Sequence, residues 1–140
     1  MITATRRIQF AAGHRVFGHE GKCRHLHGHN FIALVTAAAE DLDAVGRVID
    51  FGVLKERIGG WIEREWDHGF VVWREDAEAQ RALAQVSGQK TYLLPTNPTA
   101  ENLADHLLRT VGPDALAGTG VRLVKVTLHE TENGIAEASL

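Results

Sequence analysis

The stretch FAAGHRVFGHEGKCRHLHGHNF, residues 10–31, holds five of the chain's eight histidines and its only cysteine. His27 and His29 lie two residues apart, so both imidazoles point to the same face of an extended strand. His14 comes at the end of a preceding strand, and antiparallel pairing can bring it opposite that pair. Three neutral imidazoles suit Zn²⁺ and leave a coordination position open for substrate or water. The spacing therefore predicts a zinc site formed by His14, His27 and His29.

Two neighbouring residues compete for a place in this site. His25 has the same parity, but at ~3.3 Å per residue His25 and His29 would stand about 13 Å apart on an extended strand. That separation is too wide for one ion with Zn–N bonds of ~2.0–2.1 Å. Cys23 precedes His27 by four positions, and three roles remain open for it: a fourth ligand that closes a structural site, a thiolate base or nucleophile, or a plain buried cysteine.

Outward from this stretch, apolar and β-rich runs indicate strands, and an apolar period of 3.6 residues over 51–66 indicates a helix. Asp50 is a favourable N-cap for one helix, and Gly112-Pro113 is a stop signal for another. The order strand, strand, helix, helix, strand, strand predicts an α+β domain, an antiparallel four-stranded sheet with two main helices on one face. The expected strands are 4–12, 29–39, 121–131 and 135–139, and the expected helices are 51–66 and about 97–111. Residues 70–95 have a less regular pattern, which predicts a short helix at 77–86 and a strand at 91–94.

An open four-stranded sheet leaves two unpaired edges, which invite pairing with another chain. Joining copies edge to edge into a closed barrel removes those edges. We therefore expect a homo-oligomer.

Composition limits the classes of protein to consider. The 140 residues are 44% hydrophobic and 24% charged, so we expect one globular domain over residues 1–140. The net charge of −3 argues against a partner that is nucleic acid or a membrane surface. The single cysteine excludes an internal disulfide, and no 18-residue apolar run occurs, so we expect a cytoplasmic protein. Residues 1–31 carry a local charge of +4 against −7 for the rest, which indicates either an anionic partner or a solvated charged face.

Glu130 is a candidate because of its place on a strand. Val124, Val126 and Leu128 share one face of the strand expected over 121–131, and Glu130 continues that face. A carboxylate on an apolar face needs a strong donor partner. Otherwise Glu130 lies beyond the end of the strand, in water.

A set of short motifs runs in order along nearly the whole chain. It comprises FAAGHR at residues 10–15, CRHLHGHNF at 23–31, Asp50-Phe51, Asp67-His68, NPTAEN at 97–102 and Glu130-Thr131. This ordered set resembles the 6-pyruvoyltetrahydropterin synthase family. The three-residue gap between Cys23 and His27 is similar to that of its bacterial 6-carboxytetrahydropterin synthase branch, which serves queuosine biosynthesis. Residues 73–94 match no motif of the family.

The resemblance implies a tunnelling fold, in which antiparallel strands from three subunits form a barrel and two trimers often stack. It also implies zinc held by His14, His27 and His29. The implied substrate is 7,8-dihydroneopterin triphosphate, and the implied products are 6-carboxytetrahydropterin, acetaldehyde and triphosphate. A reaction of the same fold, 6-pyruvoyl formation by elimination of triphosphate, is one alternative. A non-catalytic zinc-binding module with Cys23 as a structural ligand is another.

The resemblance further implies roles for residues outside the zinc ligands. Cys23 is the implied proton-abstracting base, and Asp67 and His68 are the implied relay, which reaches across a subunit interface. The matches at Thr99, Glu101 and Glu130 imply contacts with the pterin, whose two-donor edge a carboxylate such as Glu130 can accept in bidentate fashion. For the triphosphate, the sequence offers three basic candidates, Arg15, Lys22 and Arg24.

Overall fold

The computed structural model describes all 140 residues, and a long hairpin forms its centre. Strand β1 (Thr3–His14) pairs antiparallel with β2 (His27–Ala39) along its whole length, from Thr3 opposite Ala38 to His14 opposite His27. Side chains alternate between the two faces, so Ile8, Phe10 and Ala12 are buried while Arg7 and Gln9 are exposed. The hairpin therefore has one apolar face, and that face ends in histidines.

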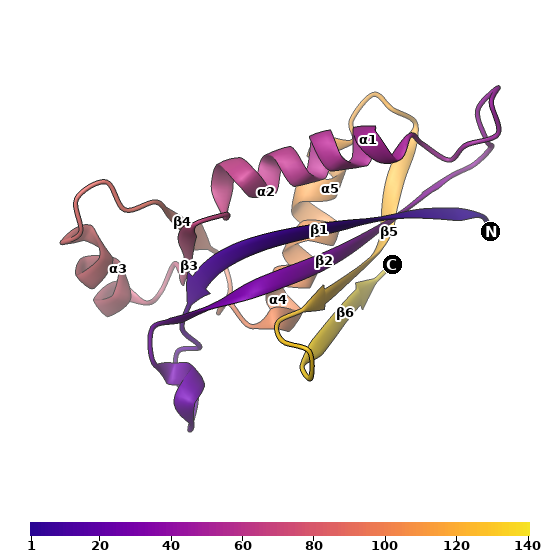
Figure 1. Ribbon diagram of the computed structural model, residues 1–140. Helices are drawn as coiled ribbons and strands as arrows, with labels where there is room; N and C mark the ends of the chain where they lie inside the picture. The colour runs from indigo at the N-terminus through magenta and orange to yellow at the C-terminus, as the bar shows by residue number, and fades with distance from the viewer.

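The sheet has six strands in the order β4-β3-β1-β2-β5-β6 (Figure 1). Antiparallel pairing continues from β2 to β5 (Val121–His129) and β6 (Ile135–Ser139), so the four predicted strands are present. The expectation of a purely antiparallel four-stranded sheet is wrong, because β3 (Gly69–Trp73) and β4 (Thr91–Leu94) add a parallel pair. The short helix α3 (Ala77–Ala84) forms the crossover between them, which parallel pairing requires.

A β-bulge in β5 changes which residues face the core. Thr36 pairs with Lys125 and Ala37 pairs with Leu123, so Val124 has no partner on β2. Leu123 is accordingly buried with Val126 and Leu128, and the expectation that Val124 shares their face is wrong. An extra residue of this kind reverses the alternation on one side of the bulge.

The first helical segment runs from Phe51 to Glu65, as the sequence predicts. It consists of α1 (Phe51–Leu54), the wide π-turn η2 (Lys55–Gly59) and α2 (Gly60–Glu65). The Asp50 carboxylate accepts a hydrogen bond from the Gly52 N–H at 2.7 Å, which fixes the start of the helix.

The second helical segment runs one turn further than expected. It consists of α4 (Ala100–His106), the π-turn η3 (Leu107–Val111) and α5 (Gly112–Ala115). The sequence predicts that Gly112-Pro113 ends it, but Pro113 stands at the start of α5, which follows η3 directly. Both helical segments pack on the apolar face of the sheet and share one core with it (Figure 1).

The end of the sheet where β1 leads into β2 carries several further segments. The 3-10 turn η1 (Lys22–Arg24) lies in the connection between those strands, and β3 joins β1 there through Ala12 and Gly13. Figure 1 shows β3, β4 and α3 gathered at this end. No helix of the structure is both long enough and apolar enough to cross a membrane.

Candidate functional site

Three histidines meet at this end of the hairpin, on the face that the helices cover. His14 pairs directly with His27, and Ala12 pairs with His29. The ring of His14 lies 4.7 Å from that of His27 and 5.2 Å from that of His29, between centroids. The three candidate ligand nitrogens lie within 4.8 Å of one another, and no cysteine or carboxylate joins the group. The structure thus brings together the three residues that strand parity selects, and the group can hold a metal ion.

The nitrogens of the three imidazoles that have no hydrogen-bond partner lie close together. Nε2 of His14, His27 and His29 is buried in each case and has no hydrogen-bond partner. His14 Nδ1 lies 2.7 Å from the Pro98 carbonyl, and His27 Nδ1 lies 2.6 Å from the His25 carbonyl. Because a carbonyl only accepts, the neutral form of each of these two rings carries its proton on Nδ1 and a lone pair on Nε2. Metal-binding histidines have this arrangement, so the donor set fits a metal ion.

Burial keeps two of these rings neutral. Burial is the largest influence on His14 and lowers its pKa to about 4. The positive charges that His27 and His29 would carry add to this shift, and the hydrogen bond to the Pro98 carbonyl opposes it. Burial also lowers the pKa of His29, with Glu130 opposing the shift and His27 adding to it. Neutral imidazole is the form that binds a metal, so both rings are ready to act as ligands at neutral pH.

Glu130 brings a carboxylate to the edge of the histidine group. It follows the last residue of β5, and its N–H donates to the Gly134 carbonyl at 3.0 Å in the turn before β6. Oε1 lies 3.6 Å from Nε2 of His29, and Oε2 lies 3.8 Å from Nε2 of His14. These separations exceed hydrogen-bond length. The carboxylate, 22% exposed, can therefore accept hydrogen bonds from another molecule beside the histidines.

Thr99 and Glu101 lie at the start of α4, directly after Pro98. The Thr99 hydroxyl accepts a hydrogen bond from the Asn102 N–H at 3.1 Å and so caps the helix. Glu101 stands in the first turn, exposed, with no hydrogen bond or ion pair. Of these two predicted pterin contacts, the Glu101 side chain has no other partner and the Thr99 hydroxyl already has one.

Cys23 lies in η1, in the connection between His14 and His27. Its carbonyl accepts a hydrogen bond from the Val16 N–H at 2.8 Å, which joins the turn to the segment after β1. The thiol is half-buried and free, and its sulfur lies outside the group of candidate ligand atoms. A closed site of one cysteine and three histidines is thus not formed here.

Asp67 and His68 form a hydrogen-bonded pair in the turn between α2 and β3. One Asp67 oxygen accepts from the Ala11 N–H at 2.9 Å, and the other lies 2.9 Å from His68 Nδ1. Burial raises the pKa of Asp67, but the hydrogen bonds from Ala11 and His68 and the charge of Lys90 together hold it below its usual range. The carboxylate therefore stays ionised and orients a His68 ring that is 81% exposed.

The backbone at His68 is strained and needs support. Its φ of 59° is left-handed, a conformation that disfavours a non-glycine residue by about 1–2 kcal/mol. The His68 N–H donates to the Ala11 carbonyl at 2.6 Å, and Lys90 Nζ donates to the Asp67 carbonyl at 2.6 Å and the Glu63 carbonyl at 2.8 Å. A Cβ on Gly69 would lie 3.0 Å from Lys90 Cγ, so glycine makes room for the lysine. Lys90 thus fixes the turn that presents His68.

His68 also lines a shallow depression of about 440 Å³ beside the hairpin. Its lining includes His27 and His29 together with Gly28 and Phe70, but not Cys23 or Glu130. Within one chain, His68 thus shares a depression with two of the histidines but not with Cys23 or Glu130.

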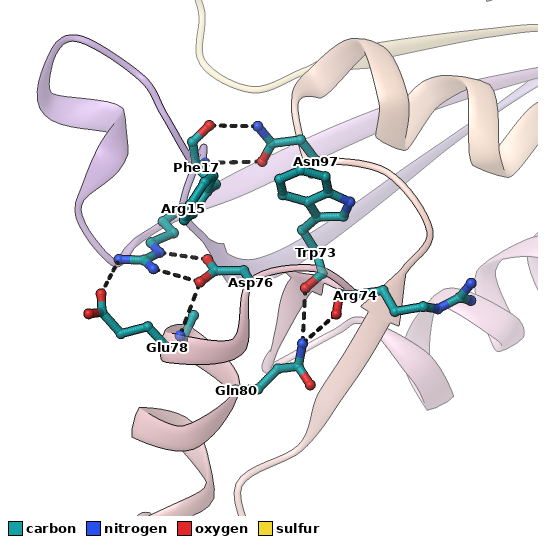
Figure 2. Close-up of polar contacts among 9 residues, drawn as sticks. Arg15, Phe17, Trp73, Arg74, Asp76, Glu78, Gln80 and Asn97 are labelled. Carbon is teal, nitrogen blue, oxygen red and sulfur yellow. Dashed lines mark hydrogen bonds and ion pairs between the residues drawn. The ribbon is translucent and has the colours of Figure 1, made fainter.

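Arg15 is held by an ion pair and is not available to a substrate phosphate. Figure 2 shows its guanidinium bound in bidentate fashion to Asp76, at 2.7 and 2.6 Å, with Glu78 at 3.2 Å. Asp76 also accepts from the Ala79 N–H and so caps α3. Among the three basic candidates, Lys22 and Arg24 remain exposed and without an ion pair.

Sequence reasoning missed the residues that support the site. The carbonyls of His25 and Pro98 orient two histidines, but a main-chain carbonyl leaves no mark on residue type. Lys90 belongs to the stretch 73–94, which matches no motif, and only the folded chain shows its contact with the Asp67 carbonyl.

Comparison with known proteins gives a consistent set of matches. The family model described as 6-pyruvoyl tetrahydropterin synthase matches residues 3–139. A protein of Rickettsia bellii named 6-carboxy-5,6,7,8-tetrahydropterin synthase is 40% identical, over 98% of this chain and 99% of its own length. A protein of the same name from Aquifex aeolicus is 32% identical over 93% of each chain.

Solved structures share the fold. The 6-pyruvoyl tetrahydropterin synthase of Caenorhabditis elegans aligns with a TM-score of 0.70 and 25% identity, covering 99% of this chain and 95% of that one. An uncharacterised protein of Wolinella succinogenes aligns with a TM-score of 0.80 over 99% of this chain and 97% of its own, at 21% identity. The second likeness shows the fold alone.

Proposed function

This chain belongs to the 6-pyruvoyl tetrahydropterin synthase family, and on that premise we propose that it is a zinc-dependent 6-carboxy-5,6,7,8-tetrahydropterin synthase of queuosine biosynthesis. It converts 7,8-dihydroneopterin triphosphate and water into 6-carboxytetrahydropterin, acetaldehyde and triphosphate. The observation that carries the proposal is the group of three buried Nε2 atoms with no partner, on a chain 40% identical to proteins of that name. When bound by His14, His27 and His29, zinc supplies a Lewis acid for the hydroxyls of the substrate side chain.

The chain's own residues hold the pterin and move its protons. Glu130 accepts hydrogen bonds from the two-donor edge of the pterin, because its carboxylate is partly exposed beside the histidines. Glu101 and Thr99, next to the Pro98 loop, provide further contacts. Cys23 takes the proton from the side-chain carbon as thiolate, and His68, held by Asp67, passes protons on the opposite side.

The free strand edges support a site shared between subunits. Only Ala12 and Gly13 of β1 pair with β3, and Ala11 bonds to Asp67 and His68, so residues 3–10 have an unpaired edge, and the outer edge of β6 is unpaired as well. Pairing these edges between copies closes a barrel, as a trimer or a hexamer, and removes both. The His68 ring, 81% exposed, then serves a neighbouring subunit, since the depression that it lines in its own chain includes neither Cys23 nor Glu130.

Product analysis tests the proposal. The purified protein is incubated with zinc and 7,8-dihydroneopterin triphosphate, and the products are separated and identified. We expect acetaldehyde, triphosphate and 6-carboxytetrahydropterin. A 6-pyruvoyl product without acetaldehyde would instead show that this chain catalyses the reaction for which the C. elegans enzyme is named.

A Cys23→Ala variant separates the enzyme from a non-catalytic zinc module. If Cys23 is the base, the variant keeps one zinc per chain and loses turnover. If Cys23 is a structural ligand, stoichiometric zinc is lost, and the catalytic proposal for this residue falls. Cys23→Ser serves as a control that keeps a similar volume without a thiolate.

A further inference from the structure

The carbonyl of Pro98 decides which nitrogen of His14 faces the other histidines. It accepts the Nδ1 proton at 2.7 Å and so leaves the lone pair on the buried Nε2. Without that acceptor, a neutral imidazole is free to carry its proton on Nε2. A protonated Nε2 has no lone pair with which to bind a metal. A main-chain carbonyl has no side chain to remove, so its position depends on whatever holds the loop that carries it.

The side chain of Asn97 holds that loop. Its Oδ1 accepts a hydrogen bond from the Phe17 N–H at 3.0 Å, and its Nδ2 donates to the Phe17 carbonyl at 2.9 Å (Figure 2). The amide thereby copies the paired bonds of an antiparallel strand. It joins the residue before Pro98 to the segment three residues after His14.

Both ends of this clamp are anchored. The Phe17 ring packs against Trp73 with centroids 5.6 Å apart, and the Arg15 guanidinium, fixed by Asp76, lies 5.7 Å from the ring centre. On the other side, the Asn97 carbonyl accepts from Asn102 Nδ2 at 2.8 Å, which joins the loop to the first turn of α4. The Asn97 amide and the His14–Pro98 bond both join these two anchored parts.

We propose that Asn97 is a positioning residue of the metal centre: by fixing the Pro98 carbonyl, it sets the tautomer and orientation of His14. This role rests on the metal site of the proposed function, although the clamp itself is a feature of the metal-free chain. Loss of such an outer support weakens metal binding by about 10–100-fold. Asn97 would thus act on the site through the loop, because both hydrogen bonds of its side chain go to the Phe17 main chain and none to the three histidines.

The test measures zinc affinity and the tautomer of His14. Zinc is titrated into wild type, Asn97→Ala and Asn97→Asp in competition with a coloured chelator. Gln80→Ala is the matched control, because the Gln80 amide also makes two hydrogen bonds to the main chain in the Figure 2 region, donating to the Trp73 and Arg74 carbonyls at 3.3 and 2.8 Å, without touching the loop. We expect Asn97→Ala to bind zinc about 10–100-fold more weakly, Asn97→Asp to lie between it and wild type, and Gln80→Ala to match wild type.

Nitrogen NMR of the imidazoles in the metal-free protein gives an independent result. We expect wild-type His14 to carry its proton on Nδ1 and Asn97→Ala to show a mixture of tautomers. If the Asn97 variants keep wild-type affinity and tautomer, or if Gln80→Ala weakens zinc equally, the positioning role is wrong. If wild type itself binds no zinc, the proposed function fails, and the tautomer measurement still decides on the clamp.

Discussion

Replacing Asp76 by asparagine removes the negative partner of a largely buried arginine. Asp76 is 2% exposed and Arg15 is 18% exposed, and two hydrogen bonds of 2.6 and 2.7 Å join them. The hydrogen bond from Arg15 is the main reason that the pKa of Asp76 lies below its usual range, and burial opposes it. Breaking a buried ion pair from one side costs about 3–5 kcal/mol. Because Arg15 keeps Glu78 and some access to water, we expect the lower end, about 3 kcal/mol.

Urea unfolding at a fixed protein concentration measures this loss. With a slope of about 2 kcal/mol per molar, 3 kcal/mol lowers the unfolding midpoint by about 1.5 M. Glu78→Gln is the control, because this second partner of the same arginine is 77% exposed and worth at most about 1 kcal/mol. Adding Arg15→Met to the Asp76→Asn variant should restore stability, since no unpaired cation remains. A midpoint for Asp76→Asn equal to that of Glu78→Gln would refute the reasoning.

Three further predictions concern the core and the turn at His68. Burial, opposed by Asp105, lowers the pKa of His106 below the unfolded value of 6.5, so the unfolded chain binds more protons as the pH falls below 6.5. Unfolding titrations should therefore show stability falling below that pH, with a smaller slope in His106→Gln. Lys90→Met should lower kcat and speed amide exchange at His68, because Lys90 holds the Asp67 carbonyl. Lys90→Arg should keep both values nearer to wild type, and the control Lys55→Met should change neither. Gly13→Ala places a Cβ in steric overlap with the edge of the Phe70 ring and should destabilise the fold by about 1–3 kcal/mol in thermal unfolding.

The group of three histidines could be predicted because it depends on a local rule. Strand parity places His27 and His29 on one face. If the pairing of the hairpin were shifted by one residue, His14 would lie on the opposite face. The same local rules predict the helix that begins after Asp50 and the last strand, which the structure has at Ile135–Ser139.

The features that sequence reasoning missed depend on partners far along the chain. The run at Gly69–Trp73 has no alternation, and it becomes a strand only because β1 and β4 lie beside it. The bulge at Val124 makes Leu123 the residue that faces the core, and the residue types of this strand do not indicate it. Arg15 looks free in the sequence, yet Asp76, 61 residues away, neutralises it.

The most direct test of the account is the zinc dependence of acetaldehyde release. Metal-stripped protein is given 7,8-dihydroneopterin triphosphate together with increasing amounts of zinc, and acetaldehyde is measured. The account predicts no release without zinc, and a rise that levels off at one zinc per chain, because His14, His27 and His29 form one site. Full release from the stripped protein, or none at any zinc concentration, would contradict it.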